Sequence, residues 1–319
     1  KMQKILIIQT AFIGDVILAT PLIETLRLQF PYSKIDFLVK NGNQNLLINH
    51  PNLNRVLVFD KSKKIISLLA LLKEIRKEKY DLVINLQRFF SSGLLTAFSG
   101  AKEKRGFKKN PLSFLFTKSF DHTVNNGLHE VERNLALIED LCKKIFKSPK
   151  LYPSASEFKK ISSFQSKSYY CIAPSSVWFT KQAPKSVWIK TIDSIKDKNA
   201  LIYLIGSSED FNLCEEISIE IKNIEVKNLA GKLSLMESAA LIKGAIRTFV
   251  NDSGPLHLAS AMNAPVTVYF CSTSPSFGFG PLSDDSEIIE VKNLSCKPCG
   301  LHGYKSCPKG HFECGEKLL

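Results

Sequence analysis

The chain has 319 residues, 44% hydrophobic and 23% charged, which is the balance of a globular protein with room for two domains. Lys and Arg outnumber Asp and Glu by 43 to 30, and residues 1–150 hold 25 of the basic and 13 of the acidic side chains. No window approaches about 18 uncharged apolar residues, which excludes a membrane-spanning helix. The first residues predict a buried strand rather than a secretory signal, so we expect a cytoplasmic protein.

The uneven charge predicts an anionic partner for the first half of the chain. Residues 151–319 carry 18 basic and 17 acidic side chains, so almost the whole excess lies before them. A nucleic acid, an anionic lipid surface or a phosphorylated substrate would each account for it, and a merely solubilising surface is the alternative.

Short β-branched segments alternate with amphipathic ones along the first half. In chain order we expect a strand at 4–9, a helix at 16–30 closed by Pro31, strands at 35–40 and 56–59, a helix at 65–79, a strand at 81–86 and a helix at 130–146. This alternation predicts parallel βαβ units and a doubly wound sheet.

The alternation pauses and then begins again. Residues 147–167 are rich in Ser, Lys and Pro and are the expected linker. Beyond them we expect strands at 169–173, 200–205, 246–250 and 266–270, with helices at 186–197, 209–221, 234–243 and 254–262. The prediction is two Rossmann-like domains, 1–155 and 156–319, facing a central cleft, with sites at the carboxyl ends of their strands.

The first candidate site lies between the first strand and its helix, in the segment TAFIGDV. Gly14 permits a tight turn or a close backbone approach. Asp15 stands where the helix begins, and an acidic residue there is either a helix cap or a reactive carboxylate at a strand end. The segment lacks G-x-G-x-x-G, which argues against a dinucleotide site.

Two further candidate sites follow strands of the second half. In NDSGPLH, residues 251–257, a polar cap, Gly254 and Pro255 predict an exposed helix N-terminus, which suits a phosphate or diphosphate. His257, one turn later, is either a donor to the same anion or a structural residue. In APSSVWFTK, residues 173–181, two hydroxyls and Lys181 form a candidate anion cradle, the alternative being a solvated lysine.

Together these segments resemble glycosyltransferase family nine, the bacterial ADP-heptose:lipopolysaccharide heptosyltransferases. AFIGDVILATPLIETLRLQFP and VNDSGPLHLASAMNAPVTVYF carry the resemblance most specifically. PSSVWFTKQAP resembles the family's phosphate-contacting loop, and HEVERN at residues 129–134 resembles its acceptor-side helix. One departure is that Lys181 is followed by Gln182-Ala183-Pro184, where the family often has Lys-Arg-Trp-Pro.

The resemblance implies a GT-B architecture and an inverting transfer that needs no metal or other cofactor. Asp15 would be the general base that deprotonates the acceptor hydroxyl. The acceptor side would further include Gly14, Arg105 and His129. The donor side would comprise Ser175, Ser176, Thr180 and Lys181 at the phosphates, Glu209 at the ribose, Leu233 at the adenine, and Asp252, Ser253, Gly254 and His257 at the diphosphate and sugar.

The implied partners are an ADP-sugar donor and an anionic glycolipid acceptor, Kdo–lipid A or a heptosylated core, with no nucleic acid. Such an acceptor lies in the cytoplasmic leaflet of the inner membrane, so a peripheral enzyme with a basic acceptor domain is expected. The basic residues expected to face it are Lys61, Lys63, Lys64, Lys102, Lys104, Arg105, Lys108 and Lys109.

Four of the eight cysteines crowd into the last residues of the chain. Cys296, Cys299, Cys307 and Cys314, with two histidines among them, have the spacing of a structural metal knuckle for zinc or iron. Reduced thiols and disulfides are the alternatives, and a metal there would have no catalytic role.

Two other interpretations stay open from the sequence. One is a GT-B transferase that uses another nucleotide-sugar. The other is a basic module without catalytic activity that binds a membrane or nucleic acid, although it would not need both Asp15 and the DSGPLH segment.

Overall fold

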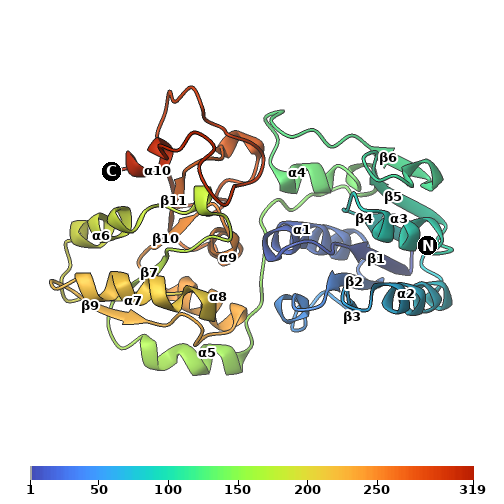
Figure 1. The fold of residues 1–319 in the computed structure, drawn as a ribbon. Coiled ribbons are helices and arrows are strands. Elements are labelled where there is room, and N and C mark those ends of the chain that lie inside the picture. The colour runs from blue at the N-terminus through green and yellow to red at the C-terminus, as the bar shows by residue number, and fades with distance from the viewer. Residues whose placement is uncertain (1) are drawn as a thin grey trace. The chain divides into compact units, whose positions relative to one another are not determined.

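Two six-stranded parallel sheets organise the chain, as a computed structural model of it shows for residues 2–319. The chain divides into two compact units, one running to Tyr152 and one spanning Pro153–Leu319. Each unit holds one sheet with helices packed on both of its faces (Figure 1). The α/β class with two doubly wound sheets is therefore confirmed.

In unit 1 the strand order is β3-β2-β1-β4-β5-β6. Its elements are β1 (Lys4–Ile8), α1 (Ile13–Gln29), β2 (Lys34–Lys40), η1 (Gln44–Leu46), β3 (Arg55–Phe59), α2 (Lys64–Glu78), β4 (Leu82–Asn85), α3 (Phe90–Ala97), β5 (Glu103–Phe107), η2 (Ser113–Leu115), β6 (Lys118–Phe120), α4 (Glu130–Leu135) and η3 (Glu139–Leu141).

Both faces of the unit 1 sheet are covered, which explains the continuous apolar runs in its strands. Helices α2 and α3 pack on the face that carries Leu6 and Ile8, while α1 and α4 pack together. The strand order reverses between β1 and β4, and the loops after these strands are joined by a hydrogen bond from Gln87 to Gln9. Such a reversal is where doubly wound sheets place their sites.

In unit 2 the strand order is β12-β11-β10-β7-β8-β9. Its elements are α5 (Ala155–Ile161), η4 (Ser162–Phe164), β7 (Tyr169–Ala173), η5 (Phe179–Lys181), α6 (Lys185–Ser194), β8 (Leu201–Leu204), η6 (Ser208–Asp210), α7 (Phe211–Glu220), β9 (Glu225–Asn228), α8 (Leu235–Gly244), β10 (Thr248–Asn251), α9 (Gly254–Ala261), β11 (Val266–Phe270), η7 (Pro275–Phe277), β12 (Ser286–Glu290) and α10 (Glu313–Glu316).

The cysteine-rich tail is part of the unit 2 core. Phe312, Cys314 and Leu318 pack in the same buried cluster as Trp188 of α6. The order of this sheet reverses between β10 and β7, so the loops after those two strands occupy the position that corresponds to the Asp15 loop of unit 1.

Two expectations about the middle of the chain are wrong. The helix expected at 130–146 ends at Leu135. Beyond it, Arg105 donates to the carbonyl of Leu137 at 2.8 Å and the amide of Phe146 donates to Thr25 of α1, so long-range hydrogen bonds stand where helical ones were expected. The linker expected at 147–167 contains α5, which Ser154 caps by accepting from the amide of Glu157 at 3.3 Å.

Candidate active site

Asp15 lies in the first turn of α1, directly after the loop that follows β1. Its Oδ2 accepts the amide of Phe12 at 3.2 Å, so the carboxylate also caps the helix. Gly14 lies beside it within the same helical turn, not in a separate turn. The capping and the catalytic interpretations of Asp15 are thus compatible, because the cap uses only one of the two carboxylate oxygens.

The surroundings of Asp15 hold its pKa at about 6, well above the usual value for an aspartic acid. Burial is the main cause, and the negative charge of Glu130 adds to it. The backbone amides of Phe12 and Asp15 and the charge of Lys40 act in the opposite direction. A carboxyl group with a pKa near 6 is ionised at neutral pH yet is basic enough to accept a proton.

Glu130 is held in place by two basic side chains. His122 Nε2 lies 2.9 Å from Glu130 Oε1, and Arg133 Nε donates to Glu130 Oε2 at 2.6 Å. Although burial raises the pKa of Glu130, His122 and Arg133 lower it overall, so the carboxylate stays charged. Sequence reasoning did not predict Glu130 and its two partners as site residues. The one signal for them in the sequence is that an acidic residue follows His129 in HEVERN.

The residues expected on the acceptor side do not form one group. His129 caps α4, accepting the amide of Val131 at 3.2 Å, and so lies next to Glu130. Arg105 is buried in β5, where it pairs with Glu103 and Asp140. That placement explains Arg105 as a structural residue, and its acceptor role stays a prediction.

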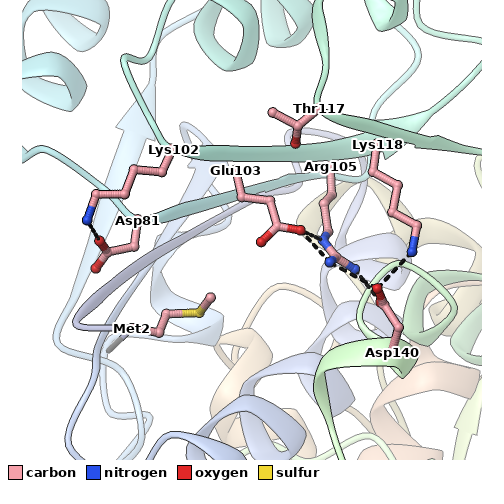
Figure 2. Close-up of a pocket in the computed structure, with 8 residues that line it drawn as sticks. All are labelled: Met2, Asp81, Lys102, Glu103, Arg105, Thr117, Lys118 and Asp140. Atoms are coloured by element: carbon pink, nitrogen blue, oxygen red, sulfur yellow. Dashed lines mark hydrogen bonds and ion pairs between the residues drawn. The ribbon is translucent and has the colours of Figure 1, made fainter.

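A cavity of about 600 Å³ opens beside Arg105, at the amino ends of the strands. Figure 2 shows Arg105 between Glu103 and Asp140, with Lys118 reaching the same Asp140. Asp81, just ahead of β4, pairs with Lys102 in the same view. Because Asp15 follows the carboxyl end of β1, this cavity and Asp15 lie at opposite ends of one parallel sheet.

In unit 2, Lys181 and Asp252 meet at the point where the strand order reverses. Lys181 Nζ lies 2.9 Å from Asp252 Oδ2, and Thr273 Oγ1 donates to the same oxygen at 2.7 Å. Asn251 ties the two loops together: its Nδ2 donates to the carbonyl of Pro174 at 3.0 Å. Two loops distant in sequence therefore form one polar surface at the carboxyl edge of the sheet.

Helix α9 begins at this surface with its amides available. Ser253 is the N-cap, Pro255 lies in the first turn, and within the described chain no side chain caps the helix. His257 is buried one turn further on. Free amides at a helix N-terminus beside a lysine suit the charge of a phosphate.

The other residues expected on the donor side have different surroundings. Thr180 is buried, and its hydroxyl accepts from Ser272 at 3.0 Å and from the amide of Tyr304 at 2.8 Å, so it holds the tail against the loop. Ser175 donates to Asp210, a partner that sequence reasoning missed.

The last three residues expected on the donor side are Ser176, Glu209 and Leu233. The amide of Ser176 donates to Gln182 Oε1 at 3.1 Å, so the residue that departs from the family pattern folds the loop. Glu209 is exposed on η6, and Leu233 is half-buried ahead of α8. The structure thus brings Lys181, Asp252 and the start of α9 together, and their ligand roles stay predictions.

The tail cysteines do not form a metal site as placed. Cys296 Sγ lies 4.0 Å from His311 Nε2, and Cys299 Sγ donates to the carbonyl of Cys296 at 3.1 Å. Among residues 2–319, no three or more His, Cys, Asp or Glu side chains are grouped so as to hold a metal ion. The hypothesis of a structural metal therefore depends on cysteine spacing alone.

A polar site at the reversal point of each of two parallel sheets is the plan of the GT-B glycosyltransferases, and comparison with known proteins agrees with that class. The model of glycosyltransferase family 9 (heptosyltransferase) matches residues 68–306. The chain belongs to this family and is a glycosyltransferase.

Individual relatives match along most of the chain. Lipopolysaccharide heptosyltransferase 3 of Escherichia coli K12 is 30% identical over 285 residues, which cover 83% of this chain and 81% of that protein. The structure of E. coli ADP-heptose LPS heptosyltransferase II has a TM-score of 0.79 at 23% identity, covering 99% of this chain and 98% of that one. E. coli heptosyltransferase WaaC with ADP-2-deoxy-2-fluoro heptose gives 0.71 at 20% identity, with 91% and 93% covered.

Across residues 2–319, no helix is both long enough and apolar enough to cross a bilayer.

Proposed function

We propose that this chain transfers heptose from ADP-heptose to the inner core of lipopolysaccharide, on Kdo–lipid A or a heptosyl acceptor. The observation that carries the proposal is Asp15, a carboxyl group with a raised pKa at the reversal point of the unit 1 sheet. Family membership supports the transfer of a sugar. The relatives named for heptosyl transfer and for ADP-heptose support the choice of sugar and nucleotide.

In the proposed reaction Asp15 takes the proton of an acceptor hydroxyl while the oxygen of that hydroxyl attacks the anomeric carbon of the donor. The bond from that carbon to the diphosphate breaks on the opposite side, so the configuration inverts and ADP leaves with its negative charge. Lys181 and the amides of Ser253 and Gly254 stabilise that charge from fixed positions. Asp252 accepts from Thr273 and pairs with Lys181, which offsets its repulsion of the phosphates.

The test begins with the nucleotide. Purified protein is heated with ADP, UDP, GDP, CMP and their sugar conjugates, and selective stabilisation by ADP and ADP-heptose is expected. Selective stabilisation by another nucleotide would keep the reaction class and change the sugar. No response to any nucleotide would contradict the transfer proposal and favour a basic binding module.

The second stage measures transfer. With ADP-heptose and Kdo–lipid A, the wild type should form product and release ADP, while Asp15→Ala should bind ADP normally and form none. Turnover should persist in EDTA, because the proposed chemistry needs no metal. Normal turnover by Asp15→Ala would remove the general-base assignment.

The proposed acceptor also determines where in the cell the enzyme would work. A glycolipid acceptor lies in the cytoplasmic leaflet of the inner membrane, so the enzyme would work as a peripheral cytoplasmic protein on that surface. The basic excess of residues 1–150 supports contact with anionic lipid.

The cysteine spacing supports one further proposal for the tail, a structural zinc or iron ion held by Cys296, Cys299, Cys307 and Cys314. Elemental analysis of the purified protein decides it. One metal equivalent that is lost in Cys296→Ser would support the site. Fully active, thermally unchanged protein without metal would remove it.

A further inference from the structure

Unit 1 exposes large apolar side chains at one edge of its sheet. On the first two turns of α2, Ile65 is 74% exposed, Ile66 72% and Leu69 61%. Phe89 and Phe90, where α3 begins, are 53% and 57% exposed. Phe114 on η2 is 77% exposed. We call these six residues the apolar rim.

The apolar rim lies at the same edge as Asp15. Its three segments follow the carboxyl ends of β3, β4 and β5, and those of a parallel sheet share one edge. Lys61 Nζ donates to the carbonyl of Thr10 at 2.9 Å, joining the start of α2 to the Asp15 loop. Asn110 Nδ2 donates to the carbonyl of Phe89 at 3.1 Å, joining the loop before η2 to the start of α3.

The core of unit 1 does not account for the rim. Helix α2 buries Leu71 and Ile75 in the core, and Leu68 and Leu72 pack against the same cluster. Ile65, Ile66 and Leu69 point to the other side, where a surface helix ordinarily carries polar residues. A gathered set of exposed apolar side chains marks a surface that something covers.

Basic side chains surround the apolar rim, and their charge indicates which kind of partner could cover it. Lys61, Lys63 and Lys64 precede or open α2, Arg88 precedes Phe89, and Lys109 precedes η2; all of these residues are exposed. A second copy of this chain would bring like charges face to face. A nucleic acid would match the charge but leave the aliphatic residues uncovered. An anionic bilayer matches both features.

We propose that the apolar rim inserts into the boundary between head groups and acyl chains of an anionic membrane, with the surrounding lysines at the level of the lipid phosphates. This inference rests on the proposed glycolipid acceptor and deepens it. The carboxyl edge of unit 1 faces the bilayer, so the sugar of a lipid acceptor emerges beside Asp15. Lys102, Lys104 and Arg105 take no part, because they lie toward the amino ends of the strands, where Lys102 pairs with Asp81.

The test uses the full chain and sedimentation with vesicles of phosphatidylcholine, with and without phosphatidylglycerol. Wild type should bind only the anionic vesicles. The double variant Ile65→Ser/Ile66→Ser should bind them at least about tenfold more weakly. Lys63→Glu/Lys64→Glu should lose more than about tenfold, at about fivefold for each lysine removed.

Matched controls come from unit 2. Ile219→Ser and Ile246→Ser replace isoleucines that are 59% and 45% exposed, and Lys196→Glu/Lys222→Glu makes the same charge change on exposed lysines. All of them should bind vesicles like the wild type. Equal weakening by the controls would overturn the proposal, as would wild-type binding that does not depend on anionic lipid.

Two further measurements distinguish a failure of the membrane proposal from a failure of the proposed transferase function. Ile65→Ser/Ile66→Ser should keep the thermal shift with ADP and wild-type turnover on an acceptor without acyl chains. If no nucleotide-sugar is turned over but the variant still loses vesicle binding, the function fails and the membrane surface stands. A wild-type dimer in analytical ultracentrifugation that the variant loses would assign the rim to a second copy and overturn the proposal.

Discussion

Replacing Asp15 with Asn tests the electrostatics of the site through stability as well as activity. The folded chain raises the pKa of Asp15 from 3.8 to about 6, so it holds that proton more tightly than the unfolded chain does. At about 1.4 kcal/mol per pKa unit, ionising Asp15 costs the folded state up to about 3 kcal/mol. Asn carries no charge, and its oxygen still accepts the amide of Phe12.

The sign of the pH dependence follows from linkage. Between pH 3.8 and about 6 the folded wild type binds more protons than the unfolded chain, so its stability falls as the pH rises through that window. The variant has no such loss. The melting temperature of the variant should therefore rise relative to that of the wild type between pH 4 and pH 7. The expected rise is up to about 6–12 °C, at about 2–4 °C per kcal/mol. Over the same range the variant should transfer no sugar.

Asp81→Asn is the matched control, because the pKa of Asp81 is lowered to about 2, chiefly by the hydrogen bond from Lys102. Its stabilising effect is complete above the unfolded pKa and is lost only as the pH falls toward 2, so the deficit of this variant should stay constant from pH 5 to pH 8. If the difference between Asp15→Asn and wild type were equally constant with pH, the raised pKa of Asp15 would be refuted.

Three more predictions test other parts of the molecule. Glu130→Gln removes the negative charge near Asp15, so the acid limb of kcat/KM should move to lower pH; an unmoved limb would mean that Glu130 does not act on Asp15. Lys181→Ala should weaken ADP binding in calorimetry by about tenfold or more, since one charge-assisted contact is worth about 1.5–3 kcal/mol; unchanged affinity would remove Lys181 from the donor site. Arg105→Met leaves the Glu103 carboxylate unpaired and Asp140 with Lys118 alone, so it should lower the free energy of unfolding in urea by about 2 kcal/mol with ADP affinity unchanged. Weakened ADP binding by that variant would contradict its structural role.

Local patterns are enough to predict the features that depend on neighbouring residues. β1, its loop and α1 follow one another directly in the sequence, as do β10, the turn at Asp252 and Ser253, and α9. The positions of Asp15 and Gly254 at strand ends can therefore be predicted from the sequence alone. The α/β class follows from the same alternation of strands and helices.

Features that depend on distant residues could not be found this way. Just beyond the end of α4, the carbonyl of Leu137 accepts from Arg105, which lies 32 residues away in sequence. The charge near Asp15 comes from Glu130, which helical spacing marks only as a first-turn acid. Thr180 has the sequence setting of a phosphate ligand, and a local window does not contain its partner Tyr304.

The pairing of Thr180 with Tyr304 has a consequence for how the protein is made. The loop that carries Lys181 exchanges two backbone-anchored hydrogen bonds with Tyr304, and Gly303 packs so closely on Trp178 and Lys181 that a side chain there would collide with them. During synthesis these contacts are absent until residues 303 and 304 have left the ribosome, long after the sheet strands around β7 have emerged. Unit 1 has no such wait, so on a growing chain the half that carries Asp15 is complete before the half that carries Lys181.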